Sequence, residues 1–373
     1  MNPLEILKIA EKLKFACVRH TTFDQAVKDI SSQLLILDVG EVLAIVGPSR
    51  VGKSRAARQA FAQAIASRDG HSKQSVVWID NENSQANGEY STKAFMQYAC
   101  EVIKQPIYGR SGIENQSLAL RRDALIARTP EGRLRNAFEV GLKEIDAKYL
   151  VVDEAHHVGY AKGGAKVASA IFDSWKCLAH KSGVVLIVIG SYGLVDIIGR
   201  VPHFIGRQRP LEVPRYKDIS IDDLVSFRGA LQAFSDMLRP VLKAGASLLD
   251  WDRYLFEGSL GCVGHLSLWL RSALGWMASH DCSYMTKAVL QEKAFTKAHR
   301  DSLQKEISDG EVALKRFHGD EKRGEESEKE NAGQRDAVSR SNQDDKPEKR
   351  TKVGPKRKPY QRIPRRNVRG GRS

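Results

Sequence analysis

The chain has 373 residues, 42% of them hydrophobic, which suffices for the core of one large or two modest domains. It has no run of about eighteen apolar residues, and its N-terminus lacks a basic stretch followed by an apolar one, so neither a membrane span nor a secretory signal is expected. The five cysteines are scattered without a C-x-x-C pair. This pattern argues against a zinc or disulfide framework and favours a reduced, cytoplasmic protein.

The net charge of +14 is concentrated at the C-terminus. Residues 349–373 hold eleven Lys and Arg and no Asp or Glu, which leaves +3 for residues 1–348. Apolar residues nearly vanish from residue 309 onward, so we expect residues 309–373 to be disordered. A basic arm with Lys356, Arg357 and Lys358 at its centre suits nucleic-acid binding, and docking on a partner protein is the alternative.

Apolar periodicity predicts the regular elements in chain order. Helices are expected over residues 4–16 and from Phe23 onward, with Thr21 and Thr22 as possible caps. Thr129 is a plausible N-cap of a later helix that has Pro130 at its first position and ends near Asp146. Four buried strands are predicted, at 41–46, 75–80, 149–152 and 184–189, and the other helices at 55–62, 92–104, 117–128 and 165–180.

Alternating strands and helices predict an α/β fold with a parallel sheet covered on both faces. Residues 220–305 are expected to be helical throughout, with turns near Gly245 and His280. We therefore predict an N-terminal helical segment, an α/β nucleotide-binding core, a smaller α-helical domain and a basic tail. Their boundaries are 1–35, 36–217, 218–308 and 309–373.

Residues 47–54 read GPSRVGKS and fit the phosphate-binding pattern G-x-x-x-x-G-K-[ST]. A predicted strand precedes them and a predicted helix follows, so backbone N–H groups and a helix N-terminus would face phosphate oxygens. Lys53 would reach the β- and γ-phosphates of ATP, and Ser54 would hold Mg²⁺. A glycine turn with a stray lysine is the alternative. The nucleotide-binding residues of this loop would be Gly47, Pro48, Ser49, Arg50, Val51, Gly52, Lys53 and Ser54.

The strand at 149–152 delivers two carboxylates, Asp153 and Glu154. Ligands bind at the carboxyl ends of strands in open α/β sheets, so Asp153 would bind Mg²⁺ and Glu154 would activate the attacking water. The alternative is a strand that simply ends in a turn-forming Asp. His156 and His157 are not expected to ligate a metal, because adjacent side chains diverge and no third ligand is near.

A further strand ends at Gly190 and Ser191. The Ser191 hydroxyl could contact the γ-phosphate or the attacking water, although a serine that starts a turn is equally compatible. In the segment after it, Arg207 or Arg209, ahead of Arg200, could stabilise transition-state charge in a neighbouring subunit, unless the loop is simply solvated. Arg271, in the helical domain, could report the bound nucleotide.

This order of motifs resembles AAA+ ATPases, with a parallel-sheet core and a helical lid. Within them, the chain resembles the TnsC/TniB/MuB-type regulators of DNA transposition over about residues 15–275. Three segments carry this likeness: residues 19–23, RHTTF; residues 190–194, GSYGL; and residues 212–216, EVPRY. The first resembles the segment beside the adenine pocket in that family, which implies that His20 and Phe23 bind the nucleotide.

The resemblance implies that ATP-bound subunits assemble as rings or filaments on double-stranded DNA. Such assemblies recruit a transposase, respond to a TniQ/TnsD-type target selector and are reset by ATP hydrolysis. DNA phosphates would be met by basic residues, with little sequence preference. A replication initiator or helicase loader shares every ATPase motif, and a nucleotide-binding scaffold without turnover is a third possibility. The candidate DNA-binding arginines of the core are Arg121, Arg122, Arg128, Arg133 and Arg135. For any single one of them, the solvated face of an ordinary helix is the alternative.

Overall fold

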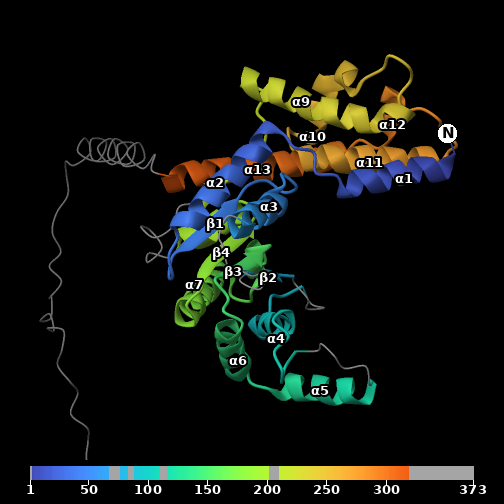
Figure 1. Cartoon of the computed structure of the whole chain (residues 1–373). Coiled ribbons are helices and arrows are strands. Elements are labelled where there is room, and N and C mark those ends of the chain that lie inside the picture. Colours follow the sequence, from blue (N-terminus) through green and yellow to red (C-terminus); the bar gives the residue numbers. More distant parts are fainter. Residues whose placement is uncertain (1, 67–75, 83–87, 110–115, 201–209, 319–373) are drawn as a thin grey trace, which may run out of the picture. The chain divides into compact units, whose positions relative to one another are not determined.

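In the computed structural model, the described residues are 2–66, 76–82, 88–109, 116–200 and 210–318. They contain a five-stranded parallel sheet with the order β2-β3-β4-β1-β5 (Figure 1). No helix within these ranges is long and apolar enough to cross a membrane. The strands are β1 (Val42–Val46), β2 (Val76–Asp80), β3 (Tyr149–Asp153), β4 (Val185–Gly190) and β5 (Pro210–Glu212).

Every residue of β1, β3 and β4 is buried, because helices cover both faces of the sheet. Alternate residues of a strand therefore enter two different cores: Leu43 and Ile45 face one side, and Val42, Ala44 and Val46 face the other. The first side is covered by α2 (Thr21–Ile36) and α3 (Lys53–Ala66). The second is covered by α4 (Thr92–Val102), α6 (Glu131–Glu144), α7 (Gly164–Ser182) and α8 (Gly193–Gly199).

A third core belongs to a helical bundle that follows β5 in the chain. Helix α1 (Pro3–Phe15) joins this bundle, since its Ile6 and Leu13 are buried there, and it runs beside α11 in Figure 1. The predicted N-terminal segment 1–35 is thus divided, with α1 in the bundle and α2 on the sheet. The other bundle helices are α9 (Ile221–Leu238), α10 (Asp252–Ser259), α11 (Val263–Ser279) and α12 (Lys287–Glu292), with short 3-10 turns at Arg239–Val241 and Leu248–Trp251.

Polar side chains cap the N-termini of several helices. Asn2 accepts from Leu4 N–H and forms a capping box with Glu5 at the start of α1, and Ser91 accepts from Ala94 N–H at the start of α4. The cap of α2 is His20, whose ring accepts from Phe23 N–H, and not Thr21 or Thr22. Pro130 is the N-cap of α6, while Thr129 instead donates to Leu125 O at the end of α5 (Gln116–Arg128).

Helix α13 (Lys297–His318) extends beyond the predicted helical boundary. The prediction of disorder from residue 309 is wrong for residues 309–318, which are helical. The reason is tertiary packing: Leu314 enters the sheet core and Gly310 is buried, although four of these ten residues are charged. The short helix α8, the 3-10 helix η2 (Ala155–Tyr160) and the edge strand β5 were not predicted either. Residues 319–373 lie outside the described part of the chain.

Candidate functional site

The strand order brings the phosphate loop, the Asp153–Glu154 pair and Ser191 together at the carboxyl ends of the strands. Strand β4 pairs with β1 on one side and with β3 on the other. The carboxyl ends of these parallel strands lead into the loop from Gly47, into Ser191, and into Asp153 and Glu154. Residues about a hundred positions apart in sequence therefore meet at the edge where open α/β sheets bind ligands.

The loop 47–54 has a backbone that needs its glycines. Gly47 has φ +155°, and a Cβ at this position would lie 2.4 Å from Val213 O. Gly52, with φ +106°, directly precedes α3, and Arg50 also has a positive φ of 58°. Such a turn between a strand and a helix N-terminus exposes consecutive N–H groups, as phosphate binding requires. This geometry favours the phosphate loop over an ordinary glycine turn.

Lys53 is folded against this loop. Its Nζ donates to Gly47 O at 3.1 Å and to Pro48 O at 2.8 Å, and the residue is only 8% exposed. Burial lowers the pKa of Lys53, while the nearby carboxylates of Glu154 and Asp153 oppose that shift. The ammonium group is therefore held at the loop, where it can compensate the charge of phosphates.

Ser54 and Asp153 form a direct hydrogen bond. Ser54 Oγ donates to Asp153 Oδ1 at 2.9 Å, and the N–H of Glu154 donates to the same oxygen at 3.0 Å. Burial raises the pKa of Asp153, and the bond from Ser54 works against that rise. A hydroxyl and a carboxylate oxygen in contact beside a phosphate loop are the donor set that Mg²⁺ takes in nucleotide sites.

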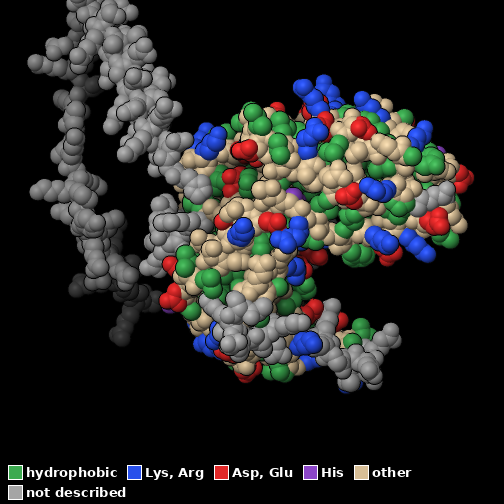
Figure 2. Space-filling model, turned by 45° about the horizontal axis from the view of Figure 1, so that its top comes forward, with side chains coloured by type: hydrophobic (Ala, Val, Ile, Leu, Met, Phe, Trp, Pro, Cys, Tyr) green, Lys and Arg blue, Asp and Glu red, His purple; other side chains and the backbone are tan. Residues whose placement is uncertain are grey.

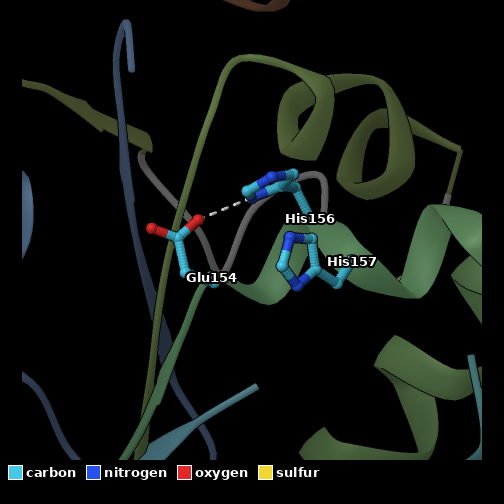
Figure 3. Close-up of side chains that lie close together, drawn as sticks. All are labelled: Glu154, His156 and His157. Carbon is cyan, nitrogen blue, oxygen red and sulfur yellow. Dashed lines mark ion pairs between the residues drawn. The ribbon is translucent and has the colours of Figure 1, made fainter. Parts of the chain in front are cut away.

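Glu154 directly follows Asp153, the last residue of β3. It has a left-handed backbone with φ +52°, and half of its side chain, 52%, is exposed. Its Oε2 lies 3.3 Å from His156 Nδ1 (Figure 3). That ring nitrogen also accepts the N–H of Ser191 at 3.4 Å, so His156 links the ends of β3 and β4. Burial lowers the pKa of His156 to about 4, which keeps the ring neutral.

The two histidines do not diverge as the sequence suggested. Their ring centroids are 4.6 Å apart, because a 3-10 turn rather than an extended strand follows Glu154. The possible ligand atoms of Glu154, His156 and His157 lie within 4.8 Å of one another (Figure 3). However, His157 Nδ1 is bonded to Asn81 O at 2.8 Å and His156 Nδ1 accepts from Ser191. These hydrogen bonds support the interpretation that both histidines line the site and pack against its loops.

A cavity of about 240 Å³ adjoins the phosphate loop. It brings together six residues that were predicted to bind the nucleotide: His20, Phe23, Arg50, Val51, Gly52 and Arg271. Arg271 Nε is buried without a hydrogen-bond partner among the described residues. The cavity is also lined by Val18, Val263, Gly264 and Ser267, which were not predicted because no sequence motif marks them.

The walls of this cavity are held by contacts between distant segments. Gly264, in the first turn of α11, packs on the phosphate loop so closely that a Cβ would lie 2.0 Å from Arg50 O. The Tyr216 hydroxyl lies 2.8 Å from His20 Nδ1 and accepts the N–H of Thr22 at 3.3 Å. Burial lowers the pKa of His20 to about 4, so its ring is neutral and can accept.

The predicted arginines have different surroundings. Arg121, Arg128 and Arg133 are exposed on α5 and α6, and Arg200 is exposed at the end of α8. Arg122 instead donates to Ile107 O and Pro106 O. Arg135 donates to Glu139 and to Ser174. Arg207, Arg209, Lys356, Arg357 and Lys358 lie outside the described residues.

Comparison with known proteins agrees with this geometry. Residues 37–198 match the family model described as an AAA domain. The five-stranded parallel sheet and its covering helices have the AAA+ fold, as the sequence predicted. No curated protein sequence matches the chain.

Many solved structures are similar to the chain, among them the following two. One is the ORC2 protein of Aeropyrum pernix, at 12% identity and a TM-score of 0.46, with 74% of this chain and 68% of that one covered. The other is a Walker-type ATPase of Pyrococcus abyssi, at 16% identity and a TM-score of 0.41, with 79% and 75% covered. The fold assignment rests on the family match and the strand order.

Proposed function

We propose that this chain is an ATP-hydrolysing, DNA-binding AAA+ regulator of DNA transposition. The observation that carries the ATPase part is the contact of Ser54 with Asp153, beside the buried Lys53 and the half-exposed Glu154. A scaffold that binds a nucleotide without turnover has no need of a carboxylate in the position of Glu154. The transposition part rests on the sequence resemblance, and two of its three segments, 19–23 and 212–216, meet through His20 and Tyr216.

In this proposal each side chain has a separate task. Lys53 and the loop N–H groups bind the phosphates, and Ser54 with Asp153 would hold Mg²⁺, which supplies charge neutralisation when bound. Glu154 accepts a proton from the attacking water, and the neutral His156 ring lies beside its carboxylate. Ser191 contacts the γ-phosphate or that water. The neutral His20 ring, Phe23 and Arg271 border the space for the base and ribose.

The proposed partners are double-stranded DNA, a transposase, a TniQ/TnsD-type target selector and further copies of this chain. A homo-oligomer would place Arg207 or Arg209 of one subunit at the nucleotide of its neighbour, where a cation stabilises transition-state charge. The exposed Arg121, Arg128 and Arg133, together with the basic tail, would contact DNA phosphates. A replication initiator or helicase loader is the second candidate, since it uses the same nucleotide site.

The test is ATP-dependent assembly on linear double-stranded DNA, observed by electron microscopy together with phosphate release. We expect assemblies with ATP, none for Lys53→Ala, and persistent assemblies for Glu154→Gln, with phosphate release lowered by about 10²- to 10⁴-fold. The exposed replacements Lys166→Ala and Glu144→Gln are matched controls. DNA binding that is the same with and without ATP would contradict the proposal. Co-purification of a replicative helicase in place of a transposase would favour the loader.

A further inference from the structure

Helix α13 joins the helical bundle to the sheet at the end of β4. The helix follows α12 of the bundle in the chain, and its C-terminal half packs beside α8. Leu314 is buried in the sheet core, and the Phe317 ring comes within 3.7 Å of the Cβ position of Gly199. Through these contacts α13 packs against the domain that contains the sheet.

The closest contact of α13 is between Gly310 and Tyr192. A Cβ on Gly310 would lie 2.2 Å from Tyr192 Cγ and 2.3 Å from its Cβ, so only a hydrogen atom fits there. These are the atoms of Tyr192 nearest its backbone, and they cannot yield by a simple rotation of the ring. Tyr192 is 2% exposed, and its hydroxyl donates to Glu212 Oε1 at 2.6 Å.

A second contact lies one residue further along α13. Glu311 Oε1 accepts from Arg215 Nε at 3.1 Å and lies 3.9 Å from Lys217 Nζ. Arg215 Nη1 also donates to Leu260 O, which immediately precedes Gly261 in the bundle. Residues 212–217 are the connection from β5 into the bundle, so α13 binds both the end of β4 and this connection.

We propose that α13 positions Ser191 for hydrolysis through the contact of Gly310 with Tyr192. This inference rests on the proposed ATPase function. Ser191 is restrained on one side by the hydrogen bond of its N–H to His156. On the other side its neighbour Tyr192 is fixed between Gly310 and Glu212. Gly310 and Tyr192 are positioning residues, because they act on the nucleotide only through Ser191.

The test compares Gly310→Ala with Ser191→Ala in the full chain. Since the added methyl group must displace Tyr192, we expect the kcat of Gly310→Ala to fall by about ten- to hundredfold. The nucleotide dissociation constant should stay within about twofold, because a group that acts only on the transition state changes kcat alone. The double variant should be no slower than Ser191→Ala. Additive losses, or a normal kcat in a folded Gly310→Ala protein, would overturn the proposal.

One control and one further test variant separate this role from general destabilisation. Gly229→Ala on α9 adds the same methyl group to a helix where no heavy atom lies within 4 Å, and it should leave kcat unchanged. Glu311→Gln weakens the bond to Arg215 without added volume, and it should also lower kcat at constant affinity. This variant decides the matter if Gly310→Ala does not fold.

Amide hydrogen exchange gives a readout that does not need turnover. Gly310→Ala should accelerate exchange at residues 191–195, whereas exchange in the phosphate loop should not change. If the wild-type chain releases no phosphate with or without DNA, the proposed function fails, and this exchange pattern still decides whether α13 restrains the end of β4. Unchanged exchange at residues 191–195 would refute that restraint.

Discussion

At the scale of single residues, burial controls the charges around the nucleotide site. Lys53 and Asp153 are both nearly buried, and burial moves the pKa of the amine down and that of the carboxyl up. Partners oppose both shifts: the carboxylates of Glu154 and Asp153 act on the pKa of Lys53, and the hydrogen bond from Ser54 acts on the pKa of Asp153. The site therefore has opposite charges close together, ready for a phosphate and a divalent cation.

His265 offers a prediction about pH and stability. It is 4% exposed, neither ring nitrogen has a partner among the described residues, and burial, with Arg50 and His299 nearby, lowers its pKa to about 4. The unfolded chain takes up this proton near pH 6.5 and the folded chain only near pH 4, so stability falls as the pH drops through that window. His265→Leu removes this penalty. Its melting temperature should decline less steeply between pH 6.5 and pH 4.5 than that of the wild type.

Melting temperatures measured by differential scanning fluorimetry across this range would check the prediction. His20 and His156 shift in the same direction, so part of the pH dependence should remain in the variant. His280→Leu, at an exposed position on the same bundle, is the matched control. If His265→Leu and the wild type had parallel profiles, His265 would not be the source of acid sensitivity.

At the scale of elements, the start of α11 supports the phosphate loop. Gly264 packs on Arg50 O so tightly that Gly264→Ala must move either the helix or the loop. Overpacking of this kind costs about 1–3 kcal/mol, which corresponds to a loss of about 5- to 140-fold in nucleotide affinity if the loop yields. Titration with a fluorescent ATP analogue would measure this loss.

A glycine on the same helix provides the comparison for Gly264. A Cβ on Gly275 meets no heavy atom within 4 Å, so Gly275→Ala should keep the wild-type affinity and stabilise α11 by up to about 1 kcal/mol. Equal nucleotide affinity of Gly264→Ala and Gly275→Ala would mean that α11 does not support the loop.

The elements with a local signal could be predicted from the sequence. The apolar strands β1 to β4 and the loop with Gly47, Gly52 and Lys53 match their predictions, because each is encoded by consecutive residues. The site residues that were missed, such as Val263 and Gly264, reach the cavity only through the packing of α11 on the loop. Residues 309–318 of α13 were missed for the same reason, since they are stabilised by the contacts of Gly310 with Tyr192 and of Leu314 with the sheet core.

The separation of α1 from α2 into different cores also depends on tertiary packing. Helices α1 and α2 have similar amphipathic patterns, yet α1 packs in the bundle and α2 on the sheet. Periodicity shows that a helix has a buried face, and it does not identify the surface on which that face is buried. The loop between them, which carries His20, consequently lies at the cavity beside the phosphate loop.

At the scale of the whole molecule, most of the net basic charge belongs to residues 349–373, which lie outside the described residues. On the face shown in Figure 2, the Lys and Arg side chains of the described residues are interspersed with acidic and apolar ones and form no continuous patch. Residues 1–348 carry +3, whereas residues 349–373 carry +11. Electrostatic attraction to DNA should therefore depend strongly on the tail, with the exposed arginines of α5 and α6 as a second contribution.

Removal of residues 349–373 tests how this charge is used. Each phosphate contact contributes about −0.9 to the slope of log Kobs against log salt concentration. If about half of the eleven tail cations contact DNA, truncation should reduce the magnitude of that slope by about 5, and affinity at low salt should fall steeply. Fluorescence anisotropy with labelled duplex DNA, measured over a series of salt concentrations with saturating ATP, gives both quantities.

A full-length variant with the eleven basic residues replaced by Gln is the matched control and should behave like the truncation. If the truncated and full-length chains gave the same slope, the tail would not bind DNA, and docking on a partner protein would be the better interpretation of its charge.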